Sequence, residues 1–244
     1  MYNTVDIVLP VHNEGASIEG TLAEFNRVVS TEGSASIRFV VCEDGSSDNT
    51  VGVLQRLART LPIHLISDPV RKGYSRAVVD GLRATTAELV GFVDSDGQCD
   101  PRDFPAFLAT HRAGNYDLVF GYRNPRRDHW ARIAMSRSFS LVFRLFFRLP
   151  VRDPSCPFLL IRREALQRVL RGNPGILNQG FWWEFMARAT AAKLRITEIP
   201  VTHRPRSAGT TQVYRLPALP RIAYDHLLSL VALKRELSAS FAAK

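Results

Sequence analysis

Two aspartates and a glutamine, Asp94, Asp96 and Gln98, occupy alternate positions in the segment DSDGQ. They follow the apolar run LVGFV, and a strand that gives way to a turn lets three oxygen-bearing side chains at this spacing converge on one point. Mg²⁺ and Mn²⁺ prefer oxygen ligands, and Mg²⁺ commonly joins a carboxylate to a substrate phosphate. The alternative is a solvated turn, since Asp and Gly favour turns in any context. A second acidic segment, EDGS, follows an earlier apolar run and favours the metal interpretation.

Short apolar runs alternate with amphipathic stretches through the first half of the chain. Near-continuous apolar strands that alternate with helices are typical of a parallel sheet covered on both faces, so we expect an α/β fold. Asp48 or Asn49 is predicted to cap the second helix. A further strand is predicted at 195–201, after long helical stretches and a Gly/Pro/Asn-rich loop at 172–180. In the first half, strands are predicted at 5–10, 37–43, 63–67, 89–94 and 118–122, and helices at 17–29, 50–59, 74–83 and 101–113.

Polar and charged residues gather where the predicted strands end. In open parallel sheets, ligands bind at the carboxyl ends of the strands. The segments that follow four of the predicted strands are PVHNEG, EDGSSDNT, DSDGQCDP and GYRNPRR. The sequence therefore predicts a polar ligand at this edge of the sheet.

The composition of the 244 residues points to an anionic partner. Thirty-two Lys and Arg against 23 Asp and Glu leave a net charge of +9. This balance favours nucleic acid, a phosphorylated substrate or an acidic membrane surface, although it could also serve solubility alone. The basic residues cluster with acidic motifs and do not form stripes interleaved with aromatic residues, which disfavours nucleic acid.

The three cysteines and the apolar runs set the expected location. An odd number of widely spaced cysteines fits neither a disulfide framework nor a metal-ligand pair and favours a reducing cytoplasm. The N-terminal segment has no basic region before its apolar run, so no signal peptide is expected. No apolar run reaches the ~18–20 residues needed to span a bilayer. We therefore expect a protein that is soluble or lies on a membrane.

The ordered segments LPVHNEG, EDGSSDNT, RKGYSRAVVDGL, DSDGQ, VFGYR and RPRSAGTT resemble the family 2 glycosyltransferases. Within that family the chain is most similar to the dolichol-phosphate mannosyltransferase, or polyprenyl-phosphate glycosyltransferase, branch. The resemblance implies a GT-A fold, with a mostly parallel sheet that holds a nucleotide sugar and a divalent metal, Mg²⁺ or Mn²⁺. We expect residues 1–215 to form this domain and 216–244 an amphipathic helix with a frayed tail.

The resemblance implies a role for each residue of this chain that matches a position of the family's motifs. Asp94 would approach the ribose or diphosphate, and Asp96 and Gln98 would hold the metal. Arg123, Arg206 and one of Arg132 and Arg137 would handle the donor diphosphate and the acceptor phosphate, since an arginine fork binds phosphate oxygens bidentately. The remaining donor-binding positions, among them those that would line the base pocket, are Pro10, His12, Glu14, Cys42, Asp44, Lys72, Ser95 and Gln212.

A phosphate acceptor is already anionic and needs no strong general base. The hypothesis is a single in-line displacement that inverts the anomeric carbon, with the metal and arginines offsetting the repulsion between two anions. The main rival is transfer to a hydroxyl acceptor, which needs a base, and Asp153 and Glu184 are the candidates. A rival from another class is a nucleotide- or lipid-binding protein that has lost catalysis. The resemblance also leads us to expect a peripheral protein at the cytoplasmic face of a membrane.

The segment 137–149 predicts a basic, phenylalanine-rich amphipathic helix. Arg137, Arg144 and Arg148 fall on one stripe at helical spacing, and Phe139, Phe143 and Phe146 lie opposite. Such a helix can lie in a membrane interface, or it can pack its aromatic rings on the core. A second amphipathic stretch, 222–237, is predicted either to extend that surface or to contact a partner subunit, a homodimer included.

Several positions depart from the family pattern. Glu43 stands where Asp is usual, and His12 replaces a common Tyr. Gln212 occupies a position where a phosphate-binding Lys is frequent, and Pro157 stiffens a stretch that usually carries a Ser/Gly turn. These departures leave the sugar, the base of the donor and the acceptor open.

Overall fold

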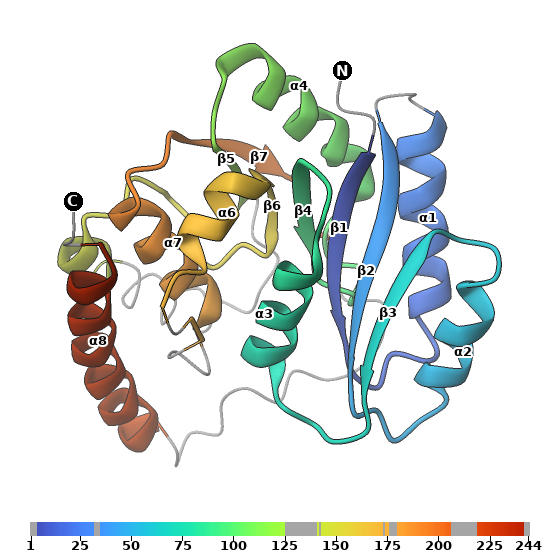
Figure 1. The fold of residues 1–244 in the computed structure, drawn as a ribbon, viewed down its shortest axis with the longest axis horizontal. Helices are drawn as coiled ribbons and strands as arrows, with labels where there is room; N and C mark the ends of the chain where they lie inside the picture. The colour runs from blue at the N-terminus through green and yellow to red at the C-terminus, as the bar shows by residue number, and fades with distance from the viewer. Residues whose placement is uncertain are drawn as a thin grey trace.

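The structure is a computed structural model that describes residues 4–31, 35–124, 141, 143–172, 174–175, 180–205 and 219–241. Between 219 and 227 it describes the course of the backbone alone. All structural statements below concern these residues. They form one mixed sheet flanked by helices (Figure 1).

Seven strands make up the sheet in the order β3-β2-β1-β4-β6-β5-β7. The four strands β3, β2, β1 and β4 run parallel, as do β5 and β7, whereas β6 is antiparallel to both its neighbours. The predicted mostly parallel α/β sheet is thereby confirmed. The strands are β1 (Thr4–Val11), β2 (Ser36–Asp44), β3 (Ile63–Asp68), β4 (Leu89–Val93), β5 (Leu118–Arg123), β6 (Phe158–Arg162) and β7 (Ile196–Val201).

The helices cover both faces because the chain reverses direction across the sheet. Strands β1, β2 and β3 proceed outward, and the chain then returns to β4 on the other side of β1, which places α3 on the face opposite to α1 and α2 (Figure 1). The helices are α1 (Ile18–Thr31), α2 (Thr50–Leu57), α3 (Tyr74–Ala84), the 3₁₀ turn η1 (Pro101–Asp103), α4 (Phe104–Gly114), α6 (Arg163–Val169), α7 (Phe181–Ala191) and α8 (Leu219–Phe241).

The central strands are buried on both faces. Val5, Ile7, Val8 and Leu9 of β1 are all fully buried. A strand enclosed in this way cannot alternate apolar and polar residues, which is why the continuous apolar runs predicted it correctly. Leu230, Leu233 and Leu237 of α8 join the same core, with α8 lying against α7.

Strand β6 was not predicted, and its absence from the sequence analysis is an error. Its five residues, FLLIR, pair with β4 on one side and β5 on the other. An apolar run this short carries no periodicity that separates strand from helix, so only the partner strands define it.

Three predicted boundaries also need correction. The helix expected at 101–113 opens with the 3₁₀ turn η1, because the Asp100 carboxylate accepts the backbone N–H of Arg102. The tail expected to fray is helical through Phe241. In the segment expected to form a helix over 137–149, residues 141 and 143–147 are helical, and Arg148 ends the helix with a φ of 52°.

Candidate active site

The ends of β1 and β2 are joined by side-chain bonds to the backbone. His12 donates from Nδ1 to the carbonyl oxygen of Asp44 at 2.9 Å, and Asn13 donates to His12 Nε2 at 3.3 Å. This pattern fits a neutral imidazole with its proton on Nδ1. Asn13 takes a left-handed φ of 55° and accepts the backbone N–H of Ser47, which closes the turn between the two strand ends.

The carboxylate of Asp44 binds the start of α3. It accepts the backbone N–H groups of Lys72 at 2.6 Å and Gly73 at 2.8 Å, and it is buried. The ammonium of Lys72 lies between Asp80 at 2.5 Å and Asp68 at 3.1 Å. The structure therefore gathers His12, Asp44 and Lys72, and two of these side chains hold the loop that leads into α3.

Three other residues expected at the base pocket, Pro10, Glu14 and Cys42, differ in their burial and in their contacts. Pro10 is buried at the end of β1, and the carboxylate of Glu14 accepts the Ser17 hydroxyl at 2.6 Å. Cys42 is 2% exposed and packs beneath Gly81 of α3. Burial raises the pKa of its thiol to about 12. The Cys42 side chain thus belongs to the α3 face of the sheet, and placing it in the base pocket was an error of side-chain direction.

The loop after β4 carries the two aspartates of the DSDGQ segment. Asp94 Oδ1 accepts the hydroxyl of Tyr74 at 2.7 Å, and Asp96 Oδ1 accepts the backbone N–H of Gln98 at 3.1 Å. Gly97 supplies a left-handed φ of 72° at the tip, and Ser95 is buried. The sharp turn therefore directs both carboxylates from one short loop.

Tyr74 is a site residue that the sequence analysis missed. Its hydroxyl donates to Asp94 and accepts the indole N–H of Trp182 on α7 at 2.8 Å. Desolvation of the hydroxyl between Asp94 and Trp182, together with the charge of Asp94, raises the pKa of Tyr74 although the residue is 39% exposed, so the hydroxyl stays protonated and donates to Asp94. The signal lies in RKGYSR, where the segment follows a strand end, but its partner Trp182 lies 108 residues away.

A strand-like pairing fixes the far side of the same loop. Cys99 bridges His203, and Arg204 donates its backbone N–H to the carbonyl oxygen of Gln98 at 2.8 Å. The Gln98 side chain donates to the Arg204 carbonyl oxygen at 3.4 Å, which leaves its amide oxygen as the atom able to accept or ligate. The guanidinium of Arg204 pairs with Glu24 and Asp100.

Arg123 and Asp153 form a bidentate ion pair at the end of β5. Their N–O distances are 2.8 and 2.9 Å, the two side chains are about 9% and 10% exposed, and Ser155 accepts a further N–H of Arg123 at 2.6 Å. Arg123 pairs with Val201 of β7, two residues before the His203 that bridges Cys99, so the ion pair lies near the acidic loop. The predicted Arg123 and Asp153 are therefore together, each holding the other.

Glu184 does not lie at this site. It is 1% exposed, and its carboxylate accepts the backbone N–H of Gly175 and the Nε–H of Arg188, both within 2.9 Å. Arg188 also donates to the Arg171 carbonyl oxygen and to Glu236 of α8. Glu184, predicted as a candidate base for a hydroxyl acceptor, is instead enclosed in a salt-bridge network between α7 and α8.

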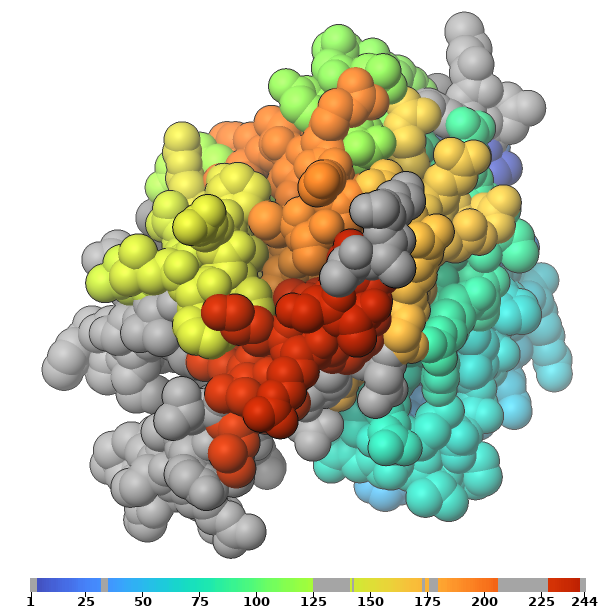
Figure 2. All heavy atoms as spheres, turned by 60° about the vertical axis from the view of Figure 1, so that its left-hand side comes forward, coloured from blue at the N-terminus to red at the C-terminus, as the bar shows by residue number. Residues whose placement is uncertain are grey.

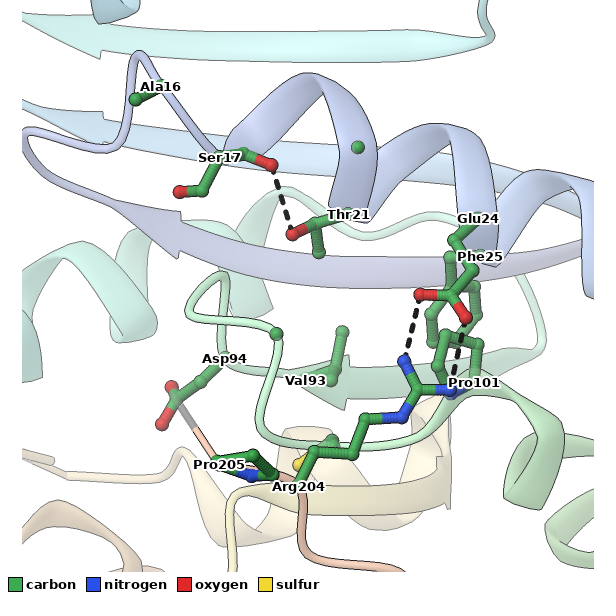
Figure 3. Close-up of a pocket in the computed structure, with 13 residues that line it drawn as sticks. Ala16, Ser17, Thr21, Glu24, Phe25, Val93, Asp94, Pro101, Arg204 and Pro205 are labelled. Atoms are coloured by element: carbon green, nitrogen blue, oxygen red, sulfur yellow. Dashed lines mark hydrogen bonds and ion pairs between the residues drawn. The ribbon is translucent and has the colours of Figure 1, made fainter. Parts of the chain in front are cut away.

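A pocket of about 490 Å³ opens between α1, the loop after β4 and residues 204–205. Asp94 lies at one end of it, and the Glu24–Arg204 pair closes the other (Figure 3). Its walls are largely apolar, with Phe25, Val93 and Pro205 among them. Of the residues predicted to bind the donor, Asp94 is the one that lines this pocket.

Four predicted phosphate-binding positions, Arg132, Arg137, Arg206 and Gln212, lie outside the described residues. Arg204 and Pro205, which are described, lead directly toward Arg206 from the acidic loop.

The donor set at the acidic loop fits a hard divalent cation. Asp94, Asp96 and Gln98 offer carboxylate and amide oxygens from five consecutive residues, with no sulfur or imidazole ligand among them. Within the described ranges, no three His, Cys, Asp or Glu side chains gather closely enough to hold a metal by themselves. Substrate or water oxygens would therefore have to complete the coordination shell.

The comparison with family models decides the family. Residues 6–170 match the model described as glycosyl transferase family 2. The chain belongs to glycosyltransferase family 2. That span includes the ends of β1, β2, β4 and β5, and therefore every strand end described above.

The chain is also similar to individual glycosyltransferases. It is 33% identical over 216 residues to an uncharacterized glycosyltransferase of Mycobacterium tuberculosis, covering 86% of this chain and 90% of that one. It is 28% identical over 225 residues to the undecaprenyl-phosphate 4-deoxy-4-formamido-L-arabinose transferase of Sodalis glossinidius, covering 91% of this chain and 66% of that one.

A solved structure shows the same GT-A fold. Glucosyl-3-phosphoglycerate synthase from Mycobacterium tuberculosis, solved with Mn²⁺, UDP and glucosyl-3-phosphoglycerate, matches with a TM-score of 0.69 at 20% identity. The match covers 95% of this chain and 80% of the other. None of the helices in the described part of the present chain is long and apolar enough to cross a membrane.

Proposed function

We propose that this glycosyltransferase moves a hexosyl group from a nucleotide sugar to a polyprenyl phosphate at a membrane surface, with inversion at the anomeric carbon. The relative from Sodalis glossinidius acts on undecaprenyl phosphate, as its name states, and the solved synthase was crystallised with Mn²⁺ and UDP. A GDP-mannose-like donor and a UDP-sugar are both compatible with the described residues. These findings support a donor with a diphosphate and an acceptor with a phosphate.

The observation that carries the proposal is the pairing of Asp153 with Arg123. Transfer to a hydroxyl needs a base that removes a proton, whereas a phosphate acceptor is already an anion. Asp153 is bound on both oxygens by one guanidinium, and such a carboxylate is a poor proton acceptor. Glu184, the other candidate base, is enclosed behind α7 and α8. The described charges therefore suit an acceptor that needs no deprotonation.

Asp96 and Gln98 would hold the divalent cation, and Asp94 would approach the ribose or diphosphate of the donor. When bound, the cation would offset the negative charge that develops on the departing nucleoside diphosphate. Tyr74 keeps Asp94 oriented, and the turn at Gly97 keeps Asp96 next to Gln98. His12 and the loop held by Asp44 would receive the nucleoside at the neighbouring strand ends.

Arg123 would offer hydrogen-bond donors to a substrate phosphate, but together with Asp153 it would add no net positive charge to the site. Its ion pair with Asp153 is neutral overall, and Asp153 with Ser155 fixes the plane of its fork. We propose that the net positive charge for two phosphate-bearing substrates comes from Arg206 and from one of Arg132 and Arg137, with Gln212 as a weaker contact.

A donor and acceptor screen tests the proposal. Purified protein with Mn²⁺ is offered UDP- and GDP-sugars together with a polyprenyl phosphate, and a chloroform-soluble glycosylated product is scored. A product formed with hydroxyl acceptors and not with polyprenyl phosphate would overturn the proposed acceptor. Neither transfer nor donor hydrolysis with any sugar nucleotide would favour a binding protein without catalysis.

A further inference from the structure

Exposed apolar side chains are concentrated on two helices. Seven large apolar side chains are exposed in the described part of the chain, and five of them lie on residues 141–147 and on α8. We call these five the two-helix surface: Leu141 (61% exposed), Leu145 (73%), Phe146 (42%), Leu228 (53%) and Val231 (42%). A cluster of this kind on one side of a protein marks an interaction site more often than single exposed residues do.

The two helices lie side by side. The Lys234 ammonium of α8 lies 4.5 Å from the centre of the Phe146 ring. Figure 2 shows the yellow-green segment that contains residues 141–147 beside the red α8 on one face of the molecule. The exposed residues of both helices therefore form one continuous surface.

The two helices make their core contacts with other side chains. Phe143 is fully buried, with its ring centre 5.4 Å from that of Trp183, and it fixes the inner side of its helix. Leu230, Leu233 and Leu237 do the same for α8. The outward side chains are a second apolar set on helices whose core contacts are already made.

Cations surround the two-helix surface. Arg144, Arg148, Lys234 and Arg235 are exposed on the same two helices. The acidic side chain described on them is Glu236, which turns inward to Arg188 and Ser240. Apolar side chains with a basic surround are the composition that lies at the interface of an anionic bilayer, where rings and aliphatic chains enter the acyl boundary and cations stay at lipid phosphates.

We propose that the two-helix surface docks onto a bilayer leaflet containing anionic lipids. A second copy of the chain fits less well, since a two-fold interface would bring the exposed cations of both copies into one contact, whereas the described acidic side chain of these helices, Glu236, is bound to Arg188. The inference deepens the proposed function by naming its membrane contact, and it rests on that function for the identity of the acceptor. Arg148 precedes Asp153 by five residues, so the surface continues directly into the chain that holds Arg123.

Vesicle sedimentation of the full chain tests the docking. We expect at least tenfold tighter binding to vesicles of phosphatidylcholine with 25% phosphatidylglycerol than to phosphatidylcholine alone, and weaker binding in 0.5 M NaCl. The double substitution Leu145→Ser with Val231→Ser should weaken binding by at least tenfold. The matched control is Val70→Ser, since Val70 is 69% exposed but lies outside the surface and should bind as the unmodified chain does. Arg144→Gln should weaken binding to the anionic vesicles about fivefold and leave binding to neutral ones unchanged.

Three outcomes would overturn the docking proposal. The first is equal binding to neutral and anionic vesicles, and the second is a loss of vesicle binding in Val70→Ser as large as in the double variant. The third is a dimer, seen by light scattering, that the double substitution Leu145→Ser with Val231→Ser dissociates. Turnover of a detergent-dispersed short-chain polyprenyl phosphate separates docking from catalysis. Turnover without vesicle binding would reject the surface and keep the proposed function. Vesicle binding without turnover of any phosphate acceptor would keep the docking surface and reject the proposed function.

Discussion

The two sides of the sheet hold their charged side chains in different ways. At the ends of β2 and β4, carboxylates are bound by neutral donors: Asp44 by two backbone N–H groups, Asp96 by one, and Asp94 by the Tyr74 hydroxyl. Beyond β5, charged side chains bind each other, as in Arg123 with Asp153 and Arg188 with Glu184. A neutral donor orients a carboxylate without compensating its charge, whereas an ion pair also compensates the charge. The described contacts of the acidic loop therefore differ in kind from those of the ion pairs beyond β5.

The largest expected effect is at the loop after β4. Asp96→Ala should lower sugar transfer by at least a hundredfold, because it removes a ligand of the proposed cation while the carboxylate binds one backbone N–H of its own loop. The measurement is turnover across a Mn²⁺ titration. Asp117→Ala, at the start of β5, is the matched control, since its carboxylate also accepts a backbone N–H but lies at the other edge of the sheet. Full activity of Asp96→Ala would remove that carboxylate from the metal site.

The buried network beyond β5 should show the opposite behaviour, a loss of stability without a loss of donor binding. Arg188→Met leaves the 1%-exposed Glu184 without its guanidinium and should cost about 3–5 kcal/mol of unfolding free energy. Thermal unfolding measures this. Arg56→Met is the control, because its pair with Glu19 is more than half exposed and its loss should leave the melting temperature nearly unchanged. Similar melting temperatures for the two variants would contradict the structural role of the Arg188 network.

Tyr74→Phe tests whether a neutral donor orients the carboxylate at the acidic loop. Removal of the hydroxyl should weaken nucleoside diphosphate binding in the presence of Mn²⁺ about tenfold, since Asp94 loses its fixed direction. Calorimetry of UDP and GDP binding gives the affinity. A structural effect alone would lower the melting temperature and leave the affinity unchanged, and Tyr116→Phe, distant from the loop, should change neither.

The smallest expected effect concerns Asp100, which combines both kinds of partner. Burial by itself would raise the pKa of the Asp100 carboxyl. The hydrogen bonds from Arg102 and Arg204 outweigh burial and lower this pKa to about 2. Its folded pKa lies below the ordinary 3.8, so its contribution is present above about pH 5 and is lost as the pH falls toward 2. Asp100→Asn should therefore remove about 1–2 kcal/mol at pH 7, with a shallower acid dependence. Denaturant unfolding between pH 7 and pH 2.5 measures this, and parallel curves for the two proteins would contradict it.

The ends of the strands could be predicted from the sequence, because a buried apolar run and the polar site residues that follow it are adjacent in the chain. A continuous apolar run predicted β4, and the polar residues that follow it predicted the acidic loop. The partners of those residues were not readable. Tyr74 meets Trp182, and Arg123 meets Asp153, across 108 and 30 residues of chain, and no local pattern reports such contacts. Side-chain direction was missed for the same reason, since Cys42 faces α3 and Glu184 faces α8.

The reversed direction of β6 has a consequence for how this glycosyltransferase can diversify. The chain leaves β5 at Arg123 and enters β6 at Phe158 on the same edge of the sheet, because the two strands are antiparallel. The connection between them therefore begins and ends beside the acidic loop. Within it, Asp153 holds Arg123 and Phe143 packs against Trp183, so any change in its length has to preserve one contact at the site and one in the core.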